Sequence, residues 1–259
     1  MRKLIVLTGI CMASTSVFAQ SSYVPAEDGD IVITPIIHSS VQVEYGDIVI
    51  QVDPWSAGDL SKAKASDLIL VTDDPGHHLD SDAIAKLRKP GAPVIVTATA
   101  QQEYKAGTVL ANGEEGRYAG LHVEAVAAYD LTPGQPWHPK GEANGYVVTI
   151  GGRRLFFSGV SECVPEIQAL ENIDVAFMPM NLPVDRMRPR PVAECVKTFQ
   201  PRFVYLYHYD NGYAGWLQNP ERSKPNPNTA ETLKLFEAEL EGSGIEFRDG
   251  NWYPPVSIR

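Results

Sequence analysis

The stretch Asp67–Asp80, DLILVTDDPGHHLD, decides the fold prediction for this 259-residue chain. The apolar run 68–71 is typical of a strand buried on both faces, and a loop with two adjacent imidazoles and three carboxylates follows it directly. The end of a rigid strand holds side chains in a fixed geometry. Imidazoles and carboxylates in such a cluster are ligands that divalent metals such as zinc accept. We therefore expect a metal site at the end of this strand.

Strand and helix patterns alternate on both sides of this stretch. Gly151-Gly152 can adopt the positive φ angles of a two-residue hairpin turn. Hydrophobic periodicity by itself allows a doubly wound α/β fold or an α/β sandwich in one domain. The patterns predict strands at 31–37, 41–45, 48–52, 68–71, 94–96, 146–150, 153–157, 175–178 and 203–207, helices at 81–88, 98–105, 165–171, 191–199 and 228–241, and a long loop at 211–228.

The first 19 residues combine two cations, a short apolar run and Val17-Phe18-Ala19 ahead of Gln20. This pattern predicts a signal peptide cleaved after Ala19, and hence a secreted or periplasmic protein without a retained membrane anchor. Cleavage of the signal peptide removes Arg2 and Lys3, which changes the formal net charge from −10 to −12. Such an acidic chain argues against nucleic acid as a substrate.

Two cysteines, Cys163 and Cys195, remain after that cleavage. An oxidising compartment would allow a disulfide between them if the two helices that carry them are neighbours. The alternative is a pair of small buried apolar side chains.

The loop after the first strand also resembles the metal-binding motif HxHxDH of the metallo-β-lactamase fold superfamily. Asp73 stands at the first histidine of that motif, Pro75 at the second, His77 at the aspartate and His78 at the last histidine. Three further segments resemble the lactonase-like and phosphodiesterase-like branch, so that the resemblance covers nearly all of 20–259. They are HSSVQVEYGDIVIQVDPW at 38–55, HPKGEANGYVVTIGGRRLFFSG at 138–159 and VYLYHY at 204–209.

This resemblance implies a single-domain, four-layer αββα sandwich at 20–259, preceded by the signal peptide at 1–19. In the family, two metals are held by histidines and aspartates. Carried over to this chain, one site comprises His77, His78 and His208. The other keeps only Asp73 and His138, because proline has no ligating side-chain atom. Val160 replaces the aspartate that bridges the two metals.

The resemblance favours a hydrolase with one divalent metal, zinc first and manganese or iron as alternatives. Asp73 or Asp74 would orient the attacking water or act as general base, and His138 would bind the substrate or protonate the leaving group. The implied substrate is a small-molecule ester, phosphoester or lactone. A rearranged dinuclear site using Asp73, Asp74 and Glu162 is a further possibility. The alternative function is that of an inactive family member that binds a small molecule or a protein partner.

Other polar residues have structural interpretations. Asp53, at the end of a predicted strand, is expected to brace the metal loop by hydrogen bonds. Asp130 is also expected to have a structural role. The arginines at 186, 188 and 190 are interpreted as a solvated loop, with recognition of an anionic substrate group as the alternative.

Overall fold

The computed structural model describes residues 21–134, 137–182 and 186–253, and within these ranges the strands form two seven-stranded mixed sheets. The strands of each sheet are arranged in sequence order. The first sheet contains β1 (Ser22–Ala26), β2 (Gly29–Ile37), β3 (Ser40–Tyr45), β4 (Ile48–Val52), β5 (Leu68–Leu70), β6 (Val94–Val96) and β7 (Thr108–Val109). The second contains β8 (Glu115–Tyr118), β9 (Leu121–Ala128), β10 (Ala143–Ile150), β11 (Arg153–Phe157), β12 (Val175–Pro179), β13 (Phe203–Tyr207) and β14 (Glu246–Arg248).

Both sheets begin as an antiparallel meander and continue in parallel. In the first, β1 to β4 pair antiparallel and β4 to β7 pair parallel. In the second, β8 to β11 pair antiparallel and β11 to β14 pair parallel. The hairpin predicted at Gly151-Gly152 is confirmed, with φ angles of 55° and 70° and with Ile150 opposite Arg153.

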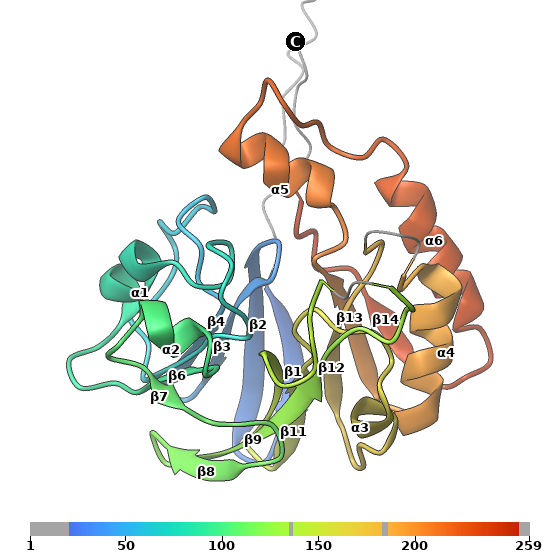
Figure 1. Cartoon of the computed structure of the whole chain (residues 1–259). Coiled ribbons are helices and arrows are strands. Elements are labelled where there is room, and N and C mark those ends of the chain that lie inside the picture. Colours follow the sequence, from blue (N-terminus) through green and yellow to red (C-terminus); the bar gives the residue numbers. More distant parts are fainter. Residues whose placement is uncertain (1–20, 135–136, 183–185, 254–259) are drawn as a thin grey trace, which may run out of the picture.

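Helices cover the outer faces of the two sheets (Figure 1). On one side lie α1 (Ser81–Leu87) and α2 (Ala100–Glu103), and on the other α3 (Pro165–Gln168), α4 (Pro189–Phe199) and α6 (Thr229–Glu239). Side chains from both sheets share one apolar core, in which Val43 and Leu70 of the first sheet join Tyr146 and Phe177 of the second. This arrangement confirms the predicted αββα sandwich in a single domain.

The pairing pattern brings several strand ends to one edge of the sandwich. β2 runs antiparallel to β3, and β3 runs antiparallel to β4, so β2, β4 and β5 all point the same way. His38, Asp53 and the Asp73–His78 loop follow these strands directly. His208 follows β13 of the second sheet, and its backbone N–H donates to the carbonyl of His38 at 2.9 Å. The ends of the two sheets therefore meet, and the polar loops converge there.

One prediction for this edge is wrong. The stretch 211–228 contains the helix α5 (Asn211–Gln218) at the top of Figure 1 instead of being loop throughout. Asp210 caps this helix by accepting from the backbone N–H of Tyr213 at 2.8 Å, and Tyr213 packs into an apolar cluster with Ile37 and Trp55. Packing thus outweighs the two glycines at 212 and 215, which disfavour a helix.

Asn228 stands at the N-terminus of α6, as predicted, but its side chain makes no capping hydrogen bond. The predicted signal peptide at 1–19 lies outside the described residues. Within the described ranges, no helix has the length and hydrophobicity needed to span a bilayer.

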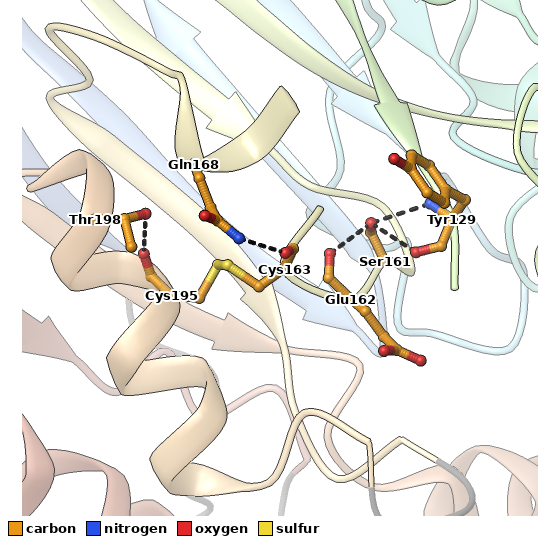
Figure 2. Close-up of a disulfide and its surroundings, with 7 residues drawn as sticks. All are labelled: Tyr129, Ser161, Glu162, Cys163, Gln168, Cys195 and Thr198. Atoms are coloured by element: carbon orange, nitrogen blue, oxygen red, sulfur yellow. Dashed lines mark hydrogen bonds between the residues drawn. A yellow bond between two sulfur atoms is a disulfide. The ribbon is translucent and has the colours of Figure 1, made fainter. Parts of the chain in front are cut away.

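The two cysteines form a disulfide, which decides between the two interpretations left open by the sequence. Cys163 precedes α3 and Cys195 lies in α4, and their Cα atoms are 5.6 Å apart (Figure 2). The backbone carbonyls of both cysteines accept side-chain hydrogen bonds, from Gln168 at 2.8 Å and from Thr198 at 2.7 Å. The bond ties the segment after β11 to a helix on the outside of the second sheet.

Reduction of this disulfide is expected to lower the free energy of unfolding. The crosslink spans 32 residues, and closing a loop of that length stabilises the folded state by about 4 kcal/mol in the chain-entropy model. Urea unfolding of the protein with and without a phosphine reductant measures the loss. A variant carrying both Cys163→Ala and Cys195→Ala is the control, because its stability should not respond to the reductant. Equal stability of wild type in both conditions would contradict the expectation.

Candidate metal centre

Three histidines converge at the edge where the sheets meet. Ligand atoms of His38, His77 and His208 all lie within 4.8 Å of one another, and among the described residues these three form the group able to hold a metal ion. The ring centroids are 3.6 Å apart for His38 and His208, 5.1 Å for His38 and His77, and 5.5 Å for His77 and His208. Three nitrogen donors at this separation suit a tetrahedral zinc site with one open position.

The backbone at this edge is strained. His38, Asp53 and His208 have positive φ angles of 55°, 43° and 50°. This left-handed conformation is unfavourable for residues other than glycine, and it concentrates at functional sites when the surrounding structure enforces it. Each of the three residues directly follows a strand, so the strand ends impose the conformation.

His78 lies beside the three histidines and is oriented by a buried carboxylate. Its Nδ1 is 2.7 Å from Oδ2 of Asp53, which also accepts from the Thr72 hydroxyl at 2.6 Å. The other Asp53 oxygen accepts from the Thr72 backbone N–H at 2.8 Å. Metal-binding histidines usually have such a carboxylate partner on the ring nitrogen that faces away from the metal. Asp53 thus braces the loop, as predicted.

Buried nitrogens without partners show that the site fits a metal. Nε2 of His78 and both ring nitrogens of His208 are buried and have no hydrogen-bond partner within the described residues. Such atoms are rare in folded proteins, because leaving a buried polar atom unpaired costs free energy. The ring of His78 stacks 5.4 Å from that of His208. A divalent cation bound at this cluster would pair with one nitrogen of each imidazole that faces it, and so with one of the two unpaired nitrogens of His208.

Burial sets the protonation of the cluster. Burial, followed by repulsion from neighbouring histidines, lowers the pKa of His38 and of His208 well below the usual value, and that of His77 to about 3. Burial also acts to lower the pKa of His78, but the charge and hydrogen bond of Asp53 outweigh it, so this pKa is raised. Three neutral imidazoles are in the form that binds a metal without first losing a proton.

Aromatic side chains enclose the cluster on one side. The hydroxyl of Tyr253 lies 2.5 Å from Nδ1 of His38 and leaves Nε2 of that ring for the cluster. The ring of Trp55 lies 6.0 Å from His38 and 6.1 Å from His77, and Trp55 is buried. This wall lowers the local dielectric around the three nitrogens and strengthens charge interactions there.

Asp73 and His138, both predicted as ligands, lie together outside the three-histidine group. Nε2 of His138 is 3.5 Å from Oδ2 of the buried Asp73, and Nδ1 is 3.4 Å from Asp130. Asp74 is half-buried, and its backbone N–H donates to Asp73 at 2.9 Å. Glu162, named for a rearranged dinuclear site, faces Arg186 at 3.4 Å and accepts from the Thr132 backbone.

Two residues at this edge have roles that the sequence did not suggest. His38 begins the segment 38–55 that resembles the family, but it was not among the predicted ligands. Arg186 was interpreted as part of a solvated loop, but its side chain is only 2% exposed and forms an ion pair with Asp130. Burial of an arginine between acidic residues depends on contacts far apart in sequence. Val160, in place of the bridging aspartate, is buried in the apolar core.

Known proteins match this chain over most of its length. A model of the β-lactamase superfamily domain matches residues 30–208. A metal-dependent hydrolase from Pyrobaculum islandicum is 26% identical over 211 residues, which are 77% of this chain and 92% of that protein. The structure of a proposed metal-dependent hydrolase from Parabacteroides distasonis is 32% identical with a TM-score of 0.77, and the match covers 90% of this chain and 98% of that one.

A more distant structure has the same fold. A metallo hydrolase from Ignicoccus hospitalis is 20% identical with a TM-score of 0.63, and the match covers 85% of this chain and 94% of that one.

The metal-free protein is expected to lose stability as the pH falls from about 6.5 to 5. The unfolded chain takes up protons on its histidines below a pKa of about 6.5, whereas His38, His77 and His208 stay neutral in the fold. The unfolded state then binds more protons, so the free energy of unfolding falls by about 1.4 kcal/mol per pH unit for each such histidine.

Urea unfolding at pH 7, 6 and 5 after removal of metals measures this slope. A variant with His38→Gln and His208→Gln should show a slope smaller by about 2.8 kcal/mol per pH unit, because two such histidines are gone. His78 contributes with the opposite sign, since its raised pKa stabilises the fold below about pH 6.5, but both proteins keep it. Equal slopes for the two proteins would contradict the neutral cluster.

Proposed function

This chain belongs to the β-lactamase superfamily and has the metallo-β-lactamase fold, and from that premise we propose that it is an exported hydrolase that uses one divalent metal, zinc, to cleave a small-molecule ester, phosphoester or lactone. Relatives that match most of its length are named metal-dependent hydrolases. The observation that carries the proposal is the convergence of three imidazoles, of which His38 and His208 are buried and His77 is half-buried. Both ring nitrogens of His208 lack a hydrogen-bond partner among the described residues.

His77 and His208 belong both to the ligand set predicted from the sequence and to the compact group in the structure. We assign the third ligand to His38, because its ligand atom lies within 4.8 Å of the other two. His78, predicted as the third ligand, is then the neighbour that Asp53 holds against the cluster. A zinc ion bound by three neutral imidazoles supplies a Lewis acid that lowers the pKa of a water molecule to about 7.

The side chains for proton transfer lie next to this site. Burial raises the pKa of Asp73, so this carboxyl can hold and release a proton closer to neutral pH than a solvated aspartate can. Nε2 of His138 lies 3.5 Å from Oδ2 of Asp73, and the His138 side chain is 17% exposed. We assign Asp73, with Asp74 beside it, to orientation and deprotonation of the attacking water, and His138 to the leaving group.

The disulfide supports an exported location, because disulfides form and persist in oxidising compartments and are rare in the cytosol. This agrees with the signal peptide predicted at 1–19 and with a secreted or periplasmic protein. The acidic sequence, with its formal net charge of −10, supports a small-molecule substrate over nucleic acid.

The competing function is that of an inactive relative that binds a small molecule or a partner. Pro75 and Val160 support it, because each replaces a ligand of the family motif with a residue that cannot bind a metal. The two functions differ in metal content, which makes metal content the decisive measurement.

We expect one equivalent of zinc, manganese or iron per chain in protein purified without a histidine tag or chelator. Mass spectrometry of the metal is combined with hydrolysis of 4-nitrophenyl butyrate, bis(4-nitrophenyl) phosphate and a lactone. His77→Gln and His208→Gln should each lose the metal, because two imidazoles remain from the group of three. His122→Gln is the matched control, since His122 lies on β9 outside the group of three histidines, 3.4 Å from Glu115 of β8 and 3.6 Å from Glu124 of β9.

His38→Gln should lose the metal, and His78→Gln should keep more of it. If His78→Gln lost the metal and His38→Gln kept it, the third ligand would be His78 instead of His38, and the hydrolase assignment would stand. Wild-type protein that stays free of metal after incubation with excess zinc would refute the proposed function and favour the inactive relative.

A further inference from the structure

We infer that Asp130 is a positioning residue for His138, and that Asp73, His138 and Asp130 form a proton-transfer array beside the metal in place of a second metal site. The inference rests on the proposed function, which it deepens by assigning the protonation of the leaving group.

Both ring nitrogens of His138 face carboxylates. Nδ1 is 3.4 Å from Oδ1 of Asp130, and Nε2 is 3.5 Å from Oδ2 of Asp73. Nε2 of His138 is therefore within reach of a carboxylate with which it can exchange a proton. The family pattern has a histidine at the position of Asp73 and the bridging aspartate at the position of Val160. What remains at this position is an imidazole between two carboxylates.

Asp130 is held tightly enough to orient the ring. Its side chain is 2% exposed, and Oδ2 accepts from the backbone N–H groups of Trp137 at 2.7 Å and of His138 at 3.0 Å. The backbone N–H of Asp130 in turn donates to the carbonyl of His138 at 3.0 Å. One carboxylate thus fixes both the backbone and the ring of His138, as the aspartate does in a catalytic triad.

A buried arginine pairs with the same Asp130 oxygen that faces His138. Arg186 forms an ion pair with Oδ1 of Asp130, and the same guanidinium nitrogen lies 3.4 Å from Glu162. Both partners in the Asp130 pair are 2% exposed. The guanidinium of Arg186 gives the buried Asp130 carboxylate a cationic partner, and a buried carboxylate without one is strongly unfavourable.

The disulfide fixes the segment that supports this arrangement. Ser161 accepts from the backbone N–H of Tyr129 at 3.1 Å, and the Glu162 backbone N–H donates to the Tyr129 carbonyl at 3.1 Å. Figure 2 shows Ser161 and Glu162 between Tyr129 and the bonded Cys163. Tyr129 precedes Asp130 in the chain. The crosslink therefore limits the movement of the segment on which the position of Asp130 depends.

Asp73 and His138 together account for every proton that moves during hydrolysis. Asp73 takes one proton from the attacking water, and His138 gives the proton on Nε2 to the oxygen of the leaving group. The proton on Asp73 then passes across 3.5 Å to Nε2 of His138. One water is split between acid and alcohol, and the side chains return to their starting state. Asp130 takes part only by keeping the ring in place.

The test compares two leaving groups. Phenyl and 4-nitrophenyl forms of the reporter that wild type cleaves are used with Asp130→Asn and His138→Gln, each loaded with zinc. Because 4-nitrophenolate leaves without a proton, kcat for the 4-nitrophenyl reporter should fall less than tenfold in both variants. Phenolate needs a proton to leave, so kcat for the phenyl reporter should fall by about 10² to 10³, the range of general acid catalysis. A merely structural role would lower both alike. Asp47→Asn, in the exposed β3–β4 turn, is the control.

Metal content separates the inference from the function on which it rests. We expect one zinc in wild type with excess zinc, and one in both variants. Two zinc ions in wild type would overturn the array, as would equal loss of kcat for both leaving groups. The first result is read on wild type and so does not depend on the folding of a variant. Wild-type protein that binds no metal would refute the proposed function together with this inference.

Discussion

The buried carboxylate of Asp53 is the interaction on which the site depends. It joins the ends of two parallel strands, because it follows β4 while its partners Thr72 and His78 follow β5. Three of its hydrogen bonds fall between 2.6 and 2.8 Å, and Asp53 is fully buried. A buried charge with this many partners permits one arrangement of the loop. The turn that carries His77 toward His38 and His208 is therefore fixed by an acid that need not touch the metal.

The strand that leads to the metal loop, the hairpin at Gly151-Gly152 and the sandwich could be predicted from the sequence, because they depend on local hydrophobic periodicity, on turn residues and on a family pattern. His77 and His208, predicted as ligands from the family pattern, lie in the group of three histidines. The roles of His38 and Arg186 were not predicted, because they arise from contacts between segments distant in sequence. The helix α5 was missed for the same reason, since Tyr213 packs against Ile37 and Trp55 in a cluster that no local pattern indicates.

The differences from the family motif form a consistent set. Pro75 removes an imidazole and Val160 removes a carboxylate, so a second cation would have few ligands there. Asp73 introduces a carboxylate where the motif has histidine, and it lies within ion-pair distance of His138. The imidazole that a second metal would have bound thus acquires a proton-accepting neighbour. A site for metal chemistry and a site for proton chemistry then lie side by side.

Charge explains why such an array can exist in a buried place. Asp73, Asp130 and Glu162 bring three carboxylates to one region, and Arg186 is the cation that pairs with two of them. Removing Arg186 would leave Asp130 buried without its cation, which is strongly unfavourable for a buried carboxylate. The backbone N–H groups of Trp137 and His138 donate to the other oxygen, Oδ2, so these bonds do not depend directly on the guanidinium. The guanidinium therefore supports the carboxylate oxygen that faces the His138 ring, and the backbone bonds to Oδ2 hold the loop.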